Sequence, residues 1–221
     1  MKNEQVKLNL MVIGANGGIG RQTVELALNY GHHVTAVLRD PAKLQLVHNN
    51  LKVVKADVMK PETFESHLEG IDAVMSAIGV KGGFFDDKPT TLYSEGNANL
   101  LDAMKRMNVN RAFFISASAV EISPVLPFFV RLAAKYVVQK LLKHMYADLL
   151  RMEELVKESG LDWTIIRPPR LTDKPATGNY RFAINSFLKN ALVISRADVA
   201  HFMINNVNHE ATYRSTIEIA Y

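Results

Sequence analysis

A glycine-rich stretch near the start of the chain has residue types and a spacing that suit the binding of phosphate groups. GANGGIG places Gly14, Gly17 and Gly20 at intervals of three residues, after an apolar run (residues 8–13) and before a helical pattern (residues 21–29). Such glycines make a tight turn, let the backbone approach a pyrophosphate and allow close helix–strand packing. The helix N-terminus then attracts the anion. We expect a dinucleotide to contact Gly14, Asn16, Gly17, Gly18, Ile19 and Gly20.

Cationic residues follow the second expected strand, residues 34–38. Arg39 comes directly after it and Lys43 four positions later. A site that prefers NAD has a carboxylate here for the ribose 2′-hydroxyl, whereas a guanidinium pairs with a 2′-phosphate. The carboxylate of Asp40 could instead bind the ribose hydroxyls, although the position of Asp40 before Pro41 also suits a helix cap. The pattern favours NADP(H) over NAD(H).

The ends of the third and fourth expected strands add further candidates. Asp57 follows residues 51–56, where a carboxylate can accept a hydrogen bond from adenine, although the same residue also suits a turn. The strand at residues 71–77 ends in small residues, which permit a close approach to a ribose, and a lysine just beyond can reach a phosphate. The candidates from these two ends are Asp57, Val58, Ala77, Ile78, Gly79 and Lys81.

Only a parallel sheet would bring these strand ends to one edge. Apolar runs at residues 8–13, 34–38, 51–56, 71–77, 111–116 and 162–167 alternate with helical patterns at residues 21–29, 41–46, 61–68 and 95–107. Strands that are apolar throughout and separated by helices are typical of a parallel sheet covered on both faces. The predicted fold class is α/β, a doubly wound Rossmann-like sheet.

The pattern changes after Pro168 and Pro169. Short strand-like pieces at residues 179–184 and 192–194 precede a capping box at residues 195–198, a helix and a last strand at residues 213–220. No linker is visible, so we expect one domain, residues 1–221, in which residues 168–221 form a small substrate-side lobe. Residues 122–145 are amphipathic and fit either a half-buried helix or a lid or partner-binding patch.

Composition limits the other functions. The 221 residues include no cysteine, which excludes disulfides and thiolate chemistry, and the seven histidines lack a metal-ligand spacing, so we expect no metal. The net charge of +4 comes from scattered residues, which argues against nucleic-acid binding. Neither a signal peptide nor an apolar run of membrane-spanning length is visible, so we expect a cytoplasmic protein. The oligomeric state stays open.

Taken together, these stretches resemble the atypical NAD(P)-binding branch of the short-chain dehydrogenases/reductases. The resemblance rests on GANGGIG, VLRDPAKL, KADV, SAIG, EGNANLLDAMK and, at residues 158–180, ESGLDWTIIRPPRLTDKPATGNY. The pattern is similar to that of flavin reductase (biliverdin-IXβ reductase) and, more distantly, of NmrA-like proteins. The resemblance implies bound NADP(H), with the 2′-phosphate on Arg39 and Lys43, the adenine framed by Asp57 and Val58, and the nicotinamide near Ser116, Ser118, Pro168, Pro169 and Arg170.

The candidate catalytic residues are Ser116, Ser118, Tyr136 and Arg170. Many members of the superfamily use a Tyr-x-x-x-Lys pair, in which the lysine lowers the tyrosine pKa so that the phenol can donate a proton. Tyr136 and Lys140 match this spacing, a match that chance also produces. Arg170 stands where the flavin reductase pattern has a histidine, and a guanidinium that stays protonated would bind an anionic group instead.

Because no residue is an assured proton donor, the sequence favours an acceptor whose reduced form spreads its negative charge and can take a proton from solvent. The leading hypothesis is an NADPH-dependent oxidoreductase that transfers hydride to a small conjugated acceptor such as a flavin or quinone. A second is an NADP(H)-sensing regulator of the NmrA-like type, without turnover. A third, a nucleotide-sugar epimerase or dehydratase, needs a firm Tyr/Lys pair and a larger substrate lobe.

Overall fold

The computed structural model describes residues 6–79, 90–121 and 143–221. Its strands are β1 (Asn9–Ile13), β2 (His33–Leu38), β3 (Leu51–Lys55), β4 (Ala73–Ser76), β5 (Arg111–Ile115), β6 (Asp162–Arg167), β7 (Arg170–Thr172), β8 (Arg181–Ile184), β9 (Val193–Ser195) and β10 (Ser215–Ala220). Its longer helices are α1 (Gly18–Asn29), α2 (Leu92–Arg106), α5 (Lys143–Glu158) and α6 (Arg196–Asn205).

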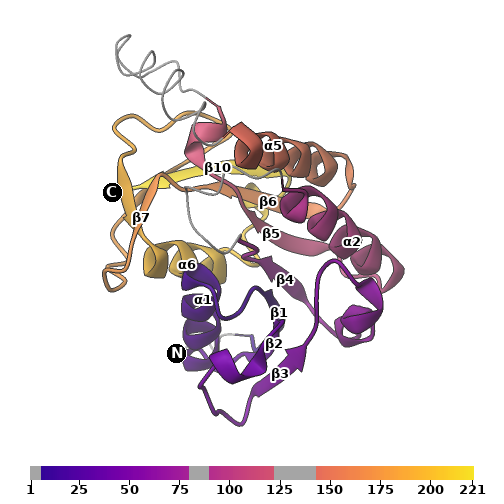
Figure 1. Ribbon diagram of the computed structural model, residues 1–221. Helices are drawn as coiled ribbons and strands as arrows, with labels where there is room; N and C mark the ends of the chain where they lie inside the picture. Colours follow the sequence, from indigo (N-terminus) through magenta and orange to yellow (C-terminus); the bar gives the residue numbers. More distant parts are fainter. Residues whose placement is uncertain (1–5, 80–89, 122–142) are drawn as a thin grey trace.

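The strands form one large sheet and one small one (Figure 1). The large sheet has eight strands in the order β3-β2-β1-β4-β5-β6-β10-β8, parallel except for β8, which runs antiparallel to β10. The chain leaves β1 toward β2 and β3, then returns to place β4 on the other side of β1. This reversal is the topological switch point, outside which α/β sheets bind their ligands. The predicted Rossmann fold is confirmed.

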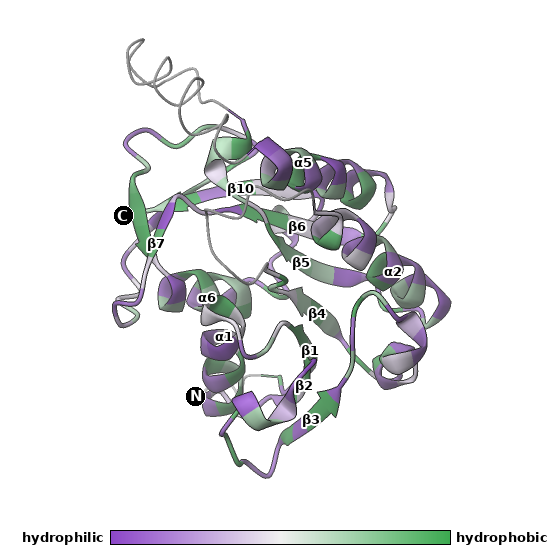
Figure 2. Cartoon of the chain, in the orientation of Figure 1, coloured by the Kyte–Doolittle hydropathy of each residue, from purple (hydrophilic) through white to green (hydrophobic). Residues whose placement is uncertain are grey.

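Helices cover both faces of the large sheet (Figure 1). Along β1, Leu10 and Val12 pack with the helices α1 and α6, whereas Met11 and Ile13 pack with α2 and α5. Since successive side chains of a strand point to opposite faces, a strand covered on both sides must be apolar throughout. Figure 2 shows the corresponding contrast: α2 and α5 alternate hydrophobic and hydrophilic residues, as helices with one buried face do.

Two predicted helices are shorter than expected. Residues 61–68 form the 3₁₀ turns Pro61–Thr63 and Glu65–Leu68, and residues 41–46 form only the turn Pro41–Lys43. In the first case Thr63 Oγ1 donates to the carbonyl of Lys60 and accepts from the N–H of Asp57. Such local side-chain bonds compete with a regular helix.

The helix α5 was missing from the sequence analysis. Tyr146, Leu149, Met152 and Val156 lie buried along one of its faces. The amphipathic segment considered above falls largely outside the described residues, at residues 122–142, and α5 begins directly after it at Lys143.

The part of the chain after Pro168 joins the large sheet. The strands β10 and β8 extend it beyond β6, α6 packs beside α1, and β7 and β9 form the separate small sheet. Ser195 caps α6 as predicted, since its Oγ accepts a hydrogen bond from the N–H of Asp198. That the chain is one domain, with a substrate-side lobe at residues 168–221, stays a prediction.

None of the helices in the described ranges combines the length and apolar character that crossing a membrane requires. Within the same ranges, no group of three or more His, Asp or Glu side chains is arranged to hold a metal ion.

Candidate functional site

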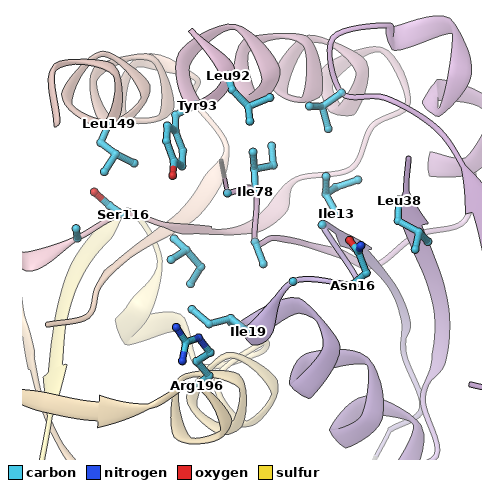
Figure 3. Close-up of a pocket in the computed structure, with 18 of the residues that line it drawn as sticks. Ile13, Asn16, Ile19, Leu38, Ile78, Leu92, Tyr93, Ser116, Leu149 and Arg196 are labelled. Atoms are coloured by element: carbon cyan, nitrogen blue, oxygen red, sulfur yellow. The ribbon is translucent and has the colours of Figure 1, made fainter. Parts of the chain in front are cut away.

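A cavity of about 480 Å³ lies at the carboxyl ends of the central parallel strands. Its walls come from the loops that follow β1, β2, β3, β4 and β5, and from the helices α2, α5 and α6 (Figure 3). This is the switch point of the sheet, where the fold places ligands. The sequence-predicted residues can therefore be compared with the actual walls.

The glycine loop forms the floor of the cavity. Gly14 has φ +77°, a conformation that L side chains rarely adopt, and a Cβ there would lie 2.5 Å from the carbonyl oxygen of Ala77. A Cβ on Gly20 would lie 2.3 Å from the carbonyl oxygen of Gly14, so α1 packs directly on the turn. Gly20 serves this packing and does not appear in the lining, whereas Gly14, Asn16, Gly17, Gly18 and Ile19 line the cavity.

The start of α1 is suited to an anion. Its N-cap is Gly17, which has no side chain to cap the first N–H groups, and its first turn contains no acidic residue. The first turn of α1 thus supplies no carboxylate to the positive end of its own helix. A dinucleotide pyrophosphate fits this place, because the glycines leave room for its phosphates and the helix offers the donors.

The end of β2 places one of its two predicted cations at the cavity. Arg39 is exposed and lines the cavity next to Leu38. Lys43 is not among the lining residues, and its Nζ lies 3.3 Å from Oδ2 of Asp40 on the surface. Asp40 is the N-cap residue of the short turn Pro41–Lys43, although its side chain makes no cap hydrogen bond.

The end of β3 forms the wall of the cavity beyond Arg39. Asp57 and Val58 both line the cavity. Asp57 Oδ1 accepts a hydrogen bond of 3.1 Å from the N–H of Met59. The carboxylate thus stabilises a turn, the alternative role that the sequence analysis left open for Asp57. Two residues of α2 hold Val58: Asn99 Nδ2 donates to its carbonyl, and a Cβ on Gly96 would come within 2.9 Å of its side chain.

The end of β4 lies opposite the glycine loop. Ala77, Ile78 and Gly79 all line the cavity, and the N–H of Ala77 donates to the carbonyl of Ile13 at 3.0 Å. The close approach of the Ala77 carbonyl to Gly14 leaves no room for a side chain at Gly14. Lys81, the predicted phosphate contact, lies outside the described residues.

Ser116 follows β5 and joins the cavity wall to a buried ion pair. Its Oγ donates to Oε1 of Glu153 at 2.7 Å, and Glu153 also accepts two bonds from Arg167. In Figure 3 the hydroxyl points toward α5, which carries Glu153. Burial alone would raise the pKa of Glu153, but its bonds to Arg167 and Ser116, with the nearby Lys157, outweigh this effect and lower it. The carboxylate is therefore ionised.

The other predicted catalytic residues lie apart from this wall. Pro168 lines the cavity, and its carbonyl accepts from the N–H of Ser118, which begins a short 3₁₀ turn and is not a lining residue. Arg170 is exposed on β7, also away from the lining. Tyr136 and Lys140 lie outside the described residues. The structure thus brings Ser116 and Pro168 to the cavity and leaves Ser118 and Arg170 outside it.

Two polar lining residues were missing from the sequence predictions. Tyr93, near the start of α2, is buried, and Figure 3 shows its hydroxyl directed toward the interior of the cavity. Arg196 begins α6 and reaches the cavity near Ile19 (Figure 3). The capping box marked the start of α6, but no motif indicated that α6 packs against the glycine loop.

Comparison with known proteins gives a consistent result. A family of NAD(P)H-binding proteins matches residues 14–210. The sugar epimerase YhfK of Bacillus subtilis, described as uncharacterised, is 30% identical over 215 residues, 96% of this chain and 94% of that protein. A photosystem II assembly factor of Cyanophora paradoxa is 27% identical over 168 residues, 72% of this chain and 44% of that protein.

A solved structure has the same fold. The short-chain dehydrogenase/reductase of Veillonella parvula, in complex with NADP, superimposes with a TM-score of 0.75 at 18% identity, covering 98% of this chain and 95% of that one. At 18% identity this likeness shows the fold alone, whereas the predicted binding of NAD(P) by this family is confirmed by the family match. Because the family match spans most of the sequence, the chain belongs to the NAD(P)H-binding family.

Proposed function

We propose that the chain is an NADPH-dependent reductase that passes a hydride to a small conjugated acceptor, such as a flavin or a quinone. The observation that carries the proposal is the continuity of the cavity. It extends from Arg39 at the end of β2, past the glycine loop, to Ser116 and Pro168. This path crosses the switch point of the sheet, as a dinucleotide does in Rossmann folds.

The adenosine end of the cavity supports a preference for NADPH. Arg39 offers a guanidinium at the place where NAD-preferring sites have a carboxylate for the ribose 2′-hydroxyl. Its charge favours a 2′-phosphate through charge-assisted hydrogen bonds. Asp57 and Val58 would lie beside the adenine. Lys43 would have to break its ion pair with Asp40 to bind the 2′-phosphate, so we assign it a smaller contribution to the binding of that phosphate than Arg39.

The other end of the cavity would hold the reacting ring. When bound, NADPH supplies a hydride from its nicotinamide. Ile115, Pro168 and Leu171 line this end and would exclude water, while the fixed wall sets the distance between the ring and an acceptor. An acceptor with a delocalised reduced form can take its proton from solvent. The reaction therefore does not depend on an acid held by the protein.

A second candidate is a protein that senses NADP(H) without turning it over. The observation that favours it is the hydrogen bond of Ser116, whose proton is directed to Glu153 rather than into the cavity. The name of the Cyanophora relative, an assembly factor, agrees with such a role. A third candidate is the epimerisation of a nucleotide-sugar, because the relative from Bacillus subtilis is named as a sugar epimerase.

The test is to mix the protein with NADPH and then with FMN, a simple quinone or a UDP-sugar, following the absorbance of the reduced nicotinamide. Oxidation with FMN or the quinone well above the protein-free rate supports the reductase. Binding of NADPH without turnover of either acceptor contradicts it and favours the sensor. Epimerisation of the UDP-sugar, followed by chromatography, contradicts it in favour of the third candidate. The variant Arg214→Gln should behave as the wild-type protein does in these assays, because Arg214 pairs with Asp162 at the opposite edge of the sheet, away from the cavity.

A further inference from the structure

Arg196 occupies a position that the predicted cofactor contacts did not include. It is the first residue of α6, whose N-cap is Ser195, and its side chain is 30% exposed. It lines the cavity together with Gly17, Gly18 and Ile19 of the glycine loop. Figure 3 shows the guanidinium extending from α6 toward Ile19 and the cavity.

The side chain of Arg196 crosses the first residue of α1. A Cβ on Gly18 would lie 2.3 Å from Cδ and 2.6 Å from Nε of Arg196. Gly18 therefore has to be glycine for the arginine to lie where it does. The arginine side chain thus lies over the first residue of α1, beside the helix N-terminus, which is where the glycine loop would hold a pyrophosphate.

Two positive groups are thus placed side by side. The first turn of α1 contains no acidic residue, and its dipole has its positive end here. Within the described part of the chain, Arg196 forms an ion pair with Asp173, whose Oδ1 lies 2.7 Å from one terminal nitrogen and whose side chain is 88% exposed. A pair so exposed contributes little to stability, and the guanidinium has further donors to offer. An anion between Arg196 and α1 would relieve the repulsion between them.

The position of Arg196 also selects which phosphate it would take. Arg39 follows Leu38, and Figure 3 shows Leu38 on one side of the glycine loop, with Arg196 and Ser116 on the other. The adenosine half would lie on the Arg39 side. We propose that Arg196 binds the phosphate of the nicotinamide half, which completes a cationic path along the cavity. This inference rests on the dinucleotide binding proposed above.

The test compares NADPH with 2′,5′-ADP, which contains the adenosine half but lacks the second phosphate. Affinities of the whole protein for both are measured by calorimetry. Arg196→Gln should weaken NADPH binding about tenfold or more, because it removes a hydrogen bond between charged groups, and leave 2′,5′-ADP within about twofold. Asp173→Asn removes the same ion pair but keeps the guanidinium, so NADPH affinity should not fall. Arg214→Gln controls for the loss of a surface arginine.

Several results would overturn the assignment. The first is an unchanged affinity for NADPH in Arg196→Gln. If that variant also has a raised KM for an anionic acceptor, Arg196 binds the acceptor rather than the cofactor. Equal losses in Arg196→Gln and Asp173→Asn would show that the ion pair acts by holding the loop. Equal losses for NADPH and 2′,5′-ADP would show a general effect on the glycine loop. The affinities for NADPH and 2′,5′-ADP are measured without turnover, so a failed reductase assay leaves the assignment of Arg196 tested on its own.

Discussion

Ser116 Oγ and Glu153 Oε1 lie 2.7 Å apart and connect the end of β5 to the inner face of α5. The serine is the donor, because the neighbouring Arg167 keeps the carboxylate ionised. A serine whose proton is held in this way does not donate it to an acceptor in the cavity. This hydrogen bond gives Ser116 a structural role in the cavity wall. It agrees with a reaction in which the reduced acceptor takes its proton from solvent.

Ser116→Ala should therefore change turnover little and stability more. We expect kcat to stay within about fivefold, because the hydroxyl is already bonded to Glu153, with an unchanged dependence of kcat on pH. The free energy of unfolding should fall by about 1–3 kcal/mol, since Glu153 loses a partner in a buried place. Steady-state kinetics across pH and urea unfolding check both expectations. A lost limb of the pH profile would instead identify Ser116 as part of a proton relay.

Glu153→Gln should destabilise the fold strongly. Glu153 is 1% exposed and its main partner, Arg167, is 8% exposed, so the change leaves a buried guanidinium with its outer partner Glu121. Breaking a buried pair in this way costs about 3–5 kcal/mol. The double variant Glu153→Met with Arg167→Met should lose less than the sum of the two single changes, as urea unfolding would show. Additive losses would mean that the two side chains are not coupled.

The same pair predicts a dependence of stability on acid. The pKa of Glu153 is lower in the folded chain than its ordinary value of 4.5. Its contribution is therefore fully present above about pH 4.5 and is lost as the pH falls through the lower, folded value. Unfolding followed from neutral to acid pH should show this loss in the wild-type chain and a smaller one in the double variant. An identical loss in both would assign acid sensitivity to other carboxylates.

Gly18→Ala should be less favourable while Arg196 is present than without it. The added Cβ would lie 2.3 Å from Cδ of Arg196, and because these atoms belong to the outer part of a flexible side chain, the arginine can shift at a small cost in stability. In the Arg196→Ala background the clash is gone, and alanine is otherwise the better residue in a helix. Thermal unfolding of the four combinations without ligand measures the coupling. Equal effects of Gly18→Ala in both backgrounds would contradict the packing of Arg196 over α1.

Arg39→Gln should remove the preference for NADPH. Its guanidinium lines the cavity at the end of β2, and the loss of a charge-assisted bond should weaken NADPH binding about tenfold while NADH is little affected. Lys43→Gln should have a smaller effect, since Lys43 pairs with Asp40 and is not a lining residue. Fluorescence titration of both nucleotides gives the ratio. A similar loss for both nucleotides would place Arg39 on a group that they share.

The sheet and the glycine loop follow from local signals. Runs such as residues 10–13 are apolar at every position, and Gly14, Gly17 and Gly20 have a spacing that one type of turn requires. The elements at residues 41–46 and 61–68 were predicted less well. At residues 61–68 the reason is that Thr63 satisfies backbone groups locally. The helix α5 escaped detection because its buried side carries the charged residues Asp148 and Glu153 among its apolar ones, and their partners lie elsewhere in the chain.

The site was predictable where its residues follow strands. Arg39, Asp57, Ile78, Ser116 and Pro168 each come directly after or close to a strand end, and parallel strands bring their ends to one edge. Arg196 and Tyr93 belong to helices whose place at the cavity depends on packing between distant parts of the chain. Their place in the cavity wall therefore emerged only from the packing of the helices α2 and α6 in the fold.

The most direct test of the central claim is the affinity of the wild-type protein for NADPH and NADH, measured by calorimetry under the same ionic conditions. Binding of one NADPH per chain, about tenfold tighter than NADH or better, is the result that Arg39 and the glycine loop predict. Equal affinities would contradict the assignment of the 2′-phosphate to Arg39. Failure to bind either nucleotide would contradict the cofactor site itself.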